Sequence, residues 1–176
     1  MALVPLTIGT VVALIVISLV SWATSHGSSG RTGAGSNALV GRTVASFRLP
    51  GLEGGTVTAP YASGHPAVVM LMASWCGPCN AEMPAIAAYL RTHATGSVRV
   101  VAVDTNDQHA NAVAFVRRYG VTFPVAYDQT ASVATNVFGF LAIPDTVFVS
   151  ARGRVVDVVQ GRLTVANLRR EIAALG

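Results

Sequence analysis

The sequence of 176 residues predicts an α/β domain built on a mixed β-sheet and preceded by an apolar segment. Two apolar runs, 67–73 (AVVMLMA) and 98–104 (VRVVAVD), have the composition of strands buried on both faces. A segment with helical spacing follows each run, and strands that alternate with helices indicate an α/β fold. Two later apolar segments flank 151–154 (ARGR), a hairpin signature that adds antiparallel strands.

The first element along the chain is the stretch 3–23, which contains no charged residue. A helix of that length spans roughly 30 Å, about the thickness of a bilayer's hydrocarbon core. Trp22 lies at its end, where interfacial aromatic residues are common. A cleaved signal peptide is the alternative, because small residues at 21 and 23 suit cleavage, but no basic residue precedes the run. The sequence favours residues 1–23 as a transmembrane anchor.

Residues 24–37 (TSHGSSGRTGAGSN) form a Gly/Ser-rich linker with a root-mean-square reach of roughly 20 Å. A globular domain, 38–176, follows this linker. Taken literally, the positive-inside rule places the domain in the cytoplasm, because Arg31 follows the span and no basic residue precedes it. On functional grounds we expect the opposite, a single-pass anchor in the cell membrane with the domain outside the cytoplasm.

Inside the domain, hydrophobic spacing and turn residues predict the remaining elements. A β-hairpin is expected over 47–49 and 56–58, around a glycine-rich turn. The other expected elements are helices over 78–92, 109–119, 132–138 and 165–175 and strands over 123–127, 146–150 and 155–160.

The charge pattern narrows the range of partners. All twelve basic residues are arginine, and the formal net charge is +4. The arginines are scattered, and no basic stripe with interleaved aromatic residues occurs, so the sequence argues against nucleic-acid binding. A mild attraction to anionic lipid is compatible with this charge.

The two cysteines lie in the run Trp75-Cys76-Gly77-Pro78-Cys79. A crosslink across so short a loop removes little entropy from the unfolded chain, which favours a chemical role over a structural one. The motif follows a predicted strand and opens a predicted helix, so Cys76 faces unpaired backbone N–H groups and the positive end of the helix dipole. Both favour the nucleophilic thiolate. Pro78 suits the first helical turn, and Gly77 permits its tight geometry.

This arrangement predicts thiol–disulfide exchange with a protein disulfide, a reaction that needs no cofactor. Cys76, which we expect to be the exposed thiol, attacks the substrate disulfide, and Cys79 resolves the mixed disulfide. A zinc half-site and a chemically inert cysteine pair are the structural alternatives. Zinc takes about four ligands, whereas the chain has no second C-x-x-C and its four histidines are isolated in sequence. We therefore expect no metal.

Three segments occur in a characteristic order: WCGPCNAEMP (75–84), YGVTFPVAYD (119–128) and IPDTVFVSARGRVV (143–156). On these the chain, from about 40 to 175, resembles the thioredoxin superfamily and, within it, the TlpA/ResA-like membrane-anchored thiol–disulfide oxidoreductases. The resemblance implies a thioredoxin fold, with a central mixed β-sheet flanked by helices and the β-hairpin as an N-terminal extension.

The resemblance also implies roles for individual residues. Cys76 matches the family's nucleophile and Cys79 its resolving thiol, while Trp75 looks like the aromatic residue that shields the pair. Pro144 matches a cis-proline opposite the active site, and Ile143 before it offers its backbone to the substrate chain. An ordinary core tryptophan and a trans turn proline are the alternatives for Trp75 and Pro144.

An acidic residue completes the candidate site. Glu82 matches the acid of the family's C-x-x-C-x-x-E-x-P pattern, with a suggested role in tuning the thiols or relaying a proton. The alternative is an acid that merely suits the helix dipole. The chain departs from ordinary thioredoxins at Met70, which stands where they carry a buried acid in the strand before the site. Glu82 or water is then the candidate relay.

These features predict an extracytoplasmic disulfide reductase. The Gly-Pro pair between the cysteines resembles that of reducing thioredoxins, whose potential is about −270 mV. The resemblance implies protein disulfide or dithiol substrates such as apocytochrome c, a role in cytochrome c-type biogenesis, and a membrane electron donor of thiol type. We expect a monomer. The alternatives are a disulfide-forming oxidase of secreted proteins and, from another class, a metal-binding module such as a copper chaperone.

Overall fold

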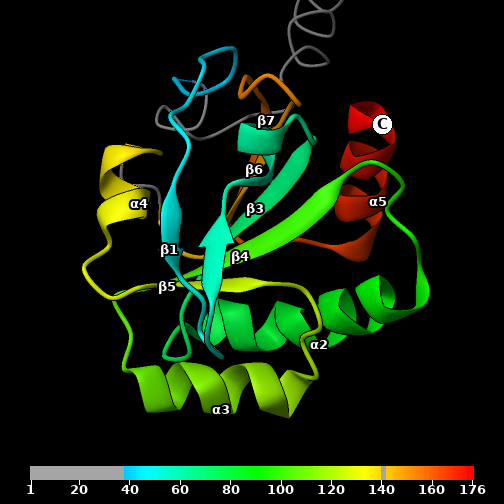
Figure 1. The fold of residues 1–176 in the computed structure, drawn as a ribbon. Coiled ribbons are helices and arrows are strands. Elements are labelled where there is room, and N and C mark those ends of the chain that lie inside the picture. Colours follow the sequence, from blue (N-terminus) through cyan, green and yellow to red (C-terminus); the bar gives the residue numbers. More distant parts are fainter. Residues whose placement is uncertain (1–37, 140–141) are drawn as a thin grey trace, which may run out of the picture. The chain divides into compact units, whose positions relative to one another are not determined.

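The computed structural model describes residues 38–139 and 142–176 and confirms the α/β class (Figure 1). All eleven strands and helices predicted for the domain are present, with bounds that shift by at most two residues, and one short 3₁₀ helix was not predicted. In chain order they are β1 (Arg48–Pro50), β2 (Thr56–Thr58), the 3₁₀ helix η1 (Pro60–Ser63), β3 (Ala67–Met72), α2 (Gly77–Thr92), β4 (Arg99–Thr105), α3 (His109–Tyr119), β5 (Val125–Asp128), α4 (Ser132–Asn136), β6 (Asp145–Val149), β7 (Val155–Gln160) and α5 (Val165–Leu175).

The central sheet has five strands in the order β5-β4-β3-β6-β7. Strands β3, β4 and β5 are parallel, β6 is antiparallel to β3, and β7 is antiparallel to β6, so the sheet is mixed as predicted. The predicted hairpin is a separate pair, β1 and β2. The Leu52 amide, in the turn of this hairpin, donates to the Val125 carbonyl at 2.8 Å and so fastens the hairpin to the edge strand β5.

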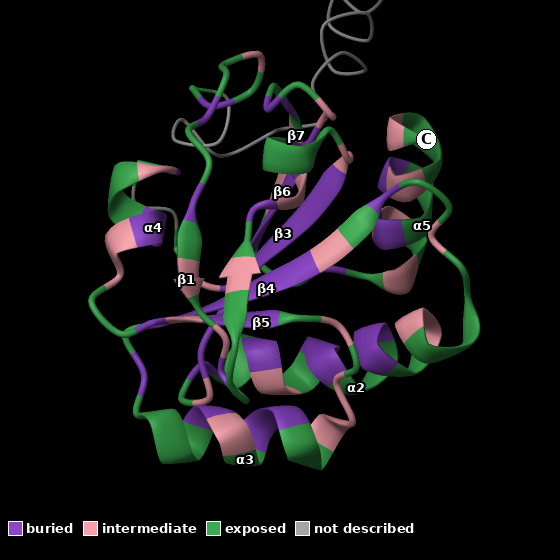
Figure 2. Cartoon of the chain, viewed as in Figure 1, coloured by how far each residue is buried: buried purple, intermediate pink, exposed green. Residues whose placement is uncertain are grey.

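Both faces of the sheet are covered. One face of β3, with Val68, Met70 and Met72, packs in a core with α2, α3 and α5. The opposite face packs with α4, η1 and the segment before β1. All six residues of β3 are therefore buried, as its unbroken apolar sequence predicted, and Figure 2 shows β3 and most of β4 as buried.

This architecture places the site at one end of the sheet. The carboxyl ends of β3, β4 and β5 lie together because these strands are parallel, and β6 begins at the same end. The β6–β7 turn lies at the opposite end, since Val149 pairs with Ala67 at the start of β3.

The predicted anchor, 1–23, and the predicted linker, 24–37, lie outside the described residues. Within 38–139 and 142–176, no helix combines the length and the apolar character that crossing a bilayer requires.

Candidate active site

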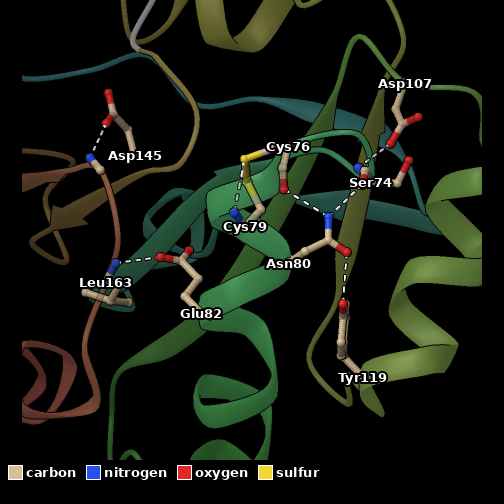
Figure 3. The surroundings of a disulfide bond; sticks show 10 residues. Ser74, Cys76, Cys79, Asn80, Glu82, Asp107, Tyr119, Asp145 and Leu163 are labelled. Carbon is tan, nitrogen blue, oxygen red and sulfur yellow. Dashed lines mark hydrogen bonds between the residues drawn. A yellow bond between two sulfur atoms is a disulfide. The ribbon is translucent and has the colours of Figure 1, made fainter.

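The two cysteines lie at the start of α2, just after the loop that follows β3, and they form a disulfide (Figure 3). The sulfur–sulfur distance is 2.08 Å and the Cα–Cα distance is 5.2 Å. Cys76 is the residue that caps the amino end of α2, and its Sγ accepts a hydrogen bond from the Cys79 N–H at 3.1 Å. The same N–H can stabilise a Cys76 thiolate, because the first amides of a helix lack partners within the helix.

The expectation of an exposed Cys76 needs correction. In the disulfide form Cys76 is only 4% exposed and Cys79 is fully buried. The physical reason is that the disulfide and the hydrogen bond from the Cys79 N–H hold the Cys76 sulfur over the first turn of α2. Cys76 is still the more accessible of the two sulfur-bearing residues.

The loop before the disulfide is held by hydrogen bonds to the loop between β4 and α3. The Ser74 N–H donates to the Asp107 carboxylate, and the Trp75 indole N–H donates to the Asn106 carbonyl at 2.9 Å. Asn106 adopts a left-handed backbone conformation, with φ of 51°, which is uncommon for a non-glycine residue. The β4–α3 loop therefore fixes the two residues that precede Cys76.

A second set of hydrogen bonds fixes the other side of the loop. The Asn80 side-chain amide donates to the Ser74 carbonyl at 2.8 Å and to the Cys76 carbonyl at 2.9 Å. The Tyr119 hydroxyl, from the end of α3, donates to the Asn80 side-chain oxygen at 2.9 Å (Figure 3). Asn80 and Tyr119 thus belong to the support of the site, although the sequence analysis did not single them out.

Three residues around the cysteines face solvent. Trp75 is 59% exposed, which excludes an ordinary core tryptophan. Gly77 and Pro78, the first two residues of α2, are exposed as well. Together they form an accessible rim beside a disulfide that is itself nearly buried.

The predicted substrate-facing loop lies beside the same end of β3. The Ile143–Pro144 peptide bond is cis, as the resemblance implied. Asp145 pairs with Leu71, so Pro144 lies next to the end of β3 that leads into Cys76. Pro144 is buried and Ile143 is half-buried.

Glu82 lies on α2, three residues after Cys79 and therefore on the same side of the helix. Its side chain is buried, and its carboxylate accepts a hydrogen bond from the Leu163 N–H (Figure 3). Burial raises the pKa of Glu82 to about 7, although the Leu163 N–H and the charge of Arg162 act in the opposite direction. A carboxyl that titrates near neutrality can both accept and release a proton.

Two further buried acids were missed by the sequence analysis. Asp104, at the end of β4, pairs with Met72 across the sheet, and neither of its carboxyl oxygens has a hydrogen-bond partner among the described residues. Burial raises the pKa of Asp104 to about 8, and the nearby charge of Asp107 adds to the shift. Asp107 links this acid to the cysteine loop through Ser74.

Asp145, directly after the cis-proline, is the second missed acid. Its Oδ1 accepts from the Gly161 N–H at 3.1 Å, whereas its Oδ2 has no partner among the described residues. Burial raises the pKa of Asp145 to about 6 against the opposing effect of that N–H. The available signal for both acids was their position at strand ends that meet at one edge of the sheet.

No described part of the chain brings together three or more histidine, cysteine or acidic side chains that could hold a metal ion. Met70 is buried in β3, where it pairs with Ala102 and Thr146. Buried carboxyls at this end of the sheet come instead from Glu82 on α2, Asp104 on β4 and Asp145 on β6.

Fold and site together define a thioredoxin-fold protein with a redox-active cysteine pair. Residues 40–158 match the AhpC/TSA family, and the chain belongs to this family within the thioredoxin superfamily. It is a thiol–disulfide oxidoreductase.

Named relatives agree with this class. The thiol–disulfide oxidoreductase ResA of Geobacillus thermodenitrificans is 26% identical over 136 residues, which cover 77% of this chain and 78% of ResA. MTB dsbF, whose structure was solved in its mixed oxidized and reduced forms, is 31% identical in sequence, with a TM-score of 0.64. The match covers 74% of this chain and 95% of dsbF. A DsbF homologue from Corynebacterium diphtheriae is 25% identical, with a TM-score of 0.64 and coverage of 76% and 89%.

Proposed function

We propose that this chain is a membrane-anchored, extracytoplasmic disulfide reductase. The observation that carries the proposal is the Cys76–Cys79 pair at the start of α2, with the Cys79 N–H directed at the Cys76 sulfur and buried Glu82 one turn further along. A nucleophilic sulfur, a resolving sulfur and a group for the proton are thereby collected on one helix.

The reaction begins from the reduced pair. The Cys76 thiolate attacks one sulfur of a substrate disulfide, forming a mixed disulfide and releasing the other substrate sulfur as a thiolate. Cys79 then loses its proton and attacks the Cys76 sulfur. The second substrate sulfur leaves, the substrate has gained two electrons, and the pair is oxidised. Glu82 accepts the proton of Cys79, for which a pKa of about 7 suits it at neutral pH.

The substrate chain is held at the rim of the disulfide. Ile143, before the cis-proline, offers its backbone to the substrate, while Trp75, Gly77 and Pro78 give the exposed contact surface. The exposed indole of Trp75 is fixed by its bond to the Asn106 carbonyl, so it presents a rigid apolar plate to an incoming chain.

The cellular setting follows from the residues ahead of the domain. Residues 1–23 anchor the chain in the cell membrane, and 24–37 tether the domain on the outer side. A membrane electron donor of thiol type re-reduces the pair, and the domain acts as a monomer. The relatives named thiol-disulfide oxidoreductase ResA support thiol–disulfide exchange. For the reductase direction, the two cysteines of a C-x-x-C-H haem-attachment segment of apocytochrome c are a suitable substrate.

The test is reduction of an oxidised C-x-x-C-H peptide by the full chain in detergent, with dithiothreitol as the upstream reductant. We expect turnover that depends on Cys76. It should exceed the turnover of a control peptide that has the same residues in a scrambled sequence. Equal rates for both peptides would reject the haem-site substrate, and no turnover of either would reject the reductase.

One observation favours a disulfide-forming oxidase as the second candidate. The hydrogen bond from the Cys79 N–H and the helix dipole stabilise a Cys76 thiolate, and stabilising the reduced form makes a pair more oxidising. The buried carboxyls around the site act the other way when ionised, because a negative charge disfavours a nearby thiolate. The reduction potential decides between these two effects.

A further inference from the structure

The charged residues of the described chain are sorted by burial. All eleven described arginines are exposed, whereas six of the eight acidic residues are buried: Glu82, Asp104, Asp107, Asp128, Asp145 and Glu171. Of the other two acidic residues, Glu53 is exposed and Asp157 is half-buried, while Glu171 pairs with the exposed Arg170. The described surface therefore presents many more arginine than acidic side chains.

Three of these arginines lie together at the end of the sheet opposite the cysteines; we call Arg42, Arg152 and Arg154 the tether-end cluster. Two hydrogen bonds join their segments: the Val155 N–H donates to the Arg42 carbonyl at 2.8 Å, and the Val44 N–H donates to the Gly153 carbonyl at 2.9 Å. In Figure 1 the segment before β1 and the β6–β7 turn lie at the same end of the domain. The cluster is thus part of the ordered fold.

No member of the cluster has an acidic side chain within ion-pair distance among the described residues. The described ion pairs are Arg117 with Glu53 and Arg170 with Glu171, and both lie elsewhere. Three exposed guanidinium groups therefore keep their full capacity for an external anion, and each can bind a phosphate in bidentate fashion.

We propose that the tether-end cluster docks the domain on anionic phospholipid headgroups. This inference rests on the tether of the proposed function: Arg42 stands nineteen positions after Ala23, and the intervening linker has a reach of roughly 20 Å. The cluster is thereby kept within reach of the bilayer surface, where a weak headgroup contact becomes effective.

Docking through this end fixes the direction in which the site points. The β6–β7 turn and the cysteine loop lie at opposite ends of β3, whose six residues span roughly 20 Å. With the cluster on the lipid, Trp75 and Pro78 point away from the bilayer toward substrates and donors in solution. Each arginine near an anionic surface strengthens the contact by a factor of about five, so three together give about 100-fold.

The experiment places the full chain in nanodiscs that contain a lipid with a nitroxide on its headgroup. One set of discs is phosphatidylcholine alone, and the other is an equal mixture with phosphatidylglycerol. Broadening of backbone amide signals in the NMR spectrum reports which residues approach the headgroups. We expect broadening of residues 41–44 and 151–154 in the anionic discs only, lost at about 1 M salt, where the Debye length is ~3 Å. The Trp75 indole signal stays sharp.

A matched pair of variants tests the assignment. The triple variant R42Q/R152Q/R154Q should lose the broadening, whereas R48Q/R118Q/R169Q, with the same change of charge on other exposed arginines, should keep it. Equal broadening in both kinds of disc, broadening centred on other residues, or equal loss in both variants overturns the proposal. Retention of the protein in phosphatidylcholine discs at high salt tests the membrane anchor separately. Peptide reduction by the same samples tests the redox function.

Discussion

The two ends of the central sheet hold ionisable groups of opposite kind in opposite environments. The end at which β3, β4 and β5 terminate, which also holds the disulfide, gathers buried carboxyls: Glu82, Asp104, Asp107, Asp128 and Asp145. The other end exposes the arginines of the tether-end cluster to solvent.

This difference separates two ways in which charge acts in one small domain. Buried carboxyls interact strongly with nearby thiols because little water screens them, and their pKa values are shifted. Exposed guanidinium groups are screened and keep their charge, so they act on external partners. Changes at the site end should therefore alter chemistry and pH dependence, and changes at the tether end should not.

The largest effect is expected from the cysteines themselves. Cys76→Ser removes the attacking sulfur and should abolish peptide reduction, whereas Cys79→Ser leaves the attack intact and should accumulate a mixed disulfide that mass spectrometry detects. Arg154→Gln, at the opposite end, should reduce the peptide at the wild-type rate. Failure of the Cys79→Ser variant to trap a substrate would contradict the assigned order of attack.

Glu82→Gln is expected to have the next largest effect. The variant keeps an acceptor for the Leu163 N–H but holds no titratable proton, so the rate should fall by roughly 10²-fold. The wild-type rate should change around pH 7, where Glu82 titrates, and this dependence should vanish in the variant. The control is Glu53→Gln, on the surface hairpin. Identical pH profiles for Glu82→Gln and wild type would reduce Glu82 to a structural role.

Asp104→Asn should change stability in a pH-dependent way. The folded pKa of Asp104, about 8, lies above the unfolded value of about 3.9, so its contribution to stability is complete below pH ~4 and is lost as the pH rises through 8. Asparagine does not titrate. The variant should therefore lose less unfolding free energy than wild type between about pH 5 and 8, by roughly 4 kcal/mol at about 1.4 kcal/mol per pH unit.

Urea unfolding at the two pH values measures this difference. Asp157→Asn, on the outer strand β7, is the control with the same chemical change, and it should follow the wild-type curve. Parallel curves for all three proteins would show that Asp104 is charged in the folded state despite its burial.

Tyr119→Phe tests the support behind the cysteine loop and should have the smallest effect. It removes the hydroxyl that donates to Asn80, and one such hydrogen bond contributes about 1 kcal/mol. Stability should fall by about that amount and peptide reduction by less than tenfold. Tyr89→Phe, on the outer part of α2, is the control; an equal loss in both would deny any special role to Tyr119.

The sequence was sufficient for the elements and for the cysteine pair. The apolar runs at β3 and β4 predicted buried strands. The C-G-P-C motif between a strand and a helix predicted the redox site. The cis geometry at Pro144 came from the family resemblance alone, because no local pattern distinguishes it from a turn proline.

The burial of the acids could not be predicted in the same way. Asp104 ends the run VRVVAVD, where an aspartate is equally suited to an exposed strand end. Its burial depends on segments remote in sequence that cover the end of β4. Cys76 is likewise nearly buried in the disulfide form, although its position at the helix start predicted an exposed thiol.

The most direct test of the account is the reduction potential of the Cys76–Cys79 pair, measured on the full chain in glutathione and dithiothreitol buffers. Reducing thioredoxins lie near about −270 mV and strong oxidants near about −120 mV, a gap worth roughly 7 kcal/mol. We expect a value close to about −270 mV, and a shift toward about −120 mV in Glu82→Gln because a negative charge near the thiols is removed. A wild-type value near −120 mV would contradict the reductase and assign the chain to disulfide formation.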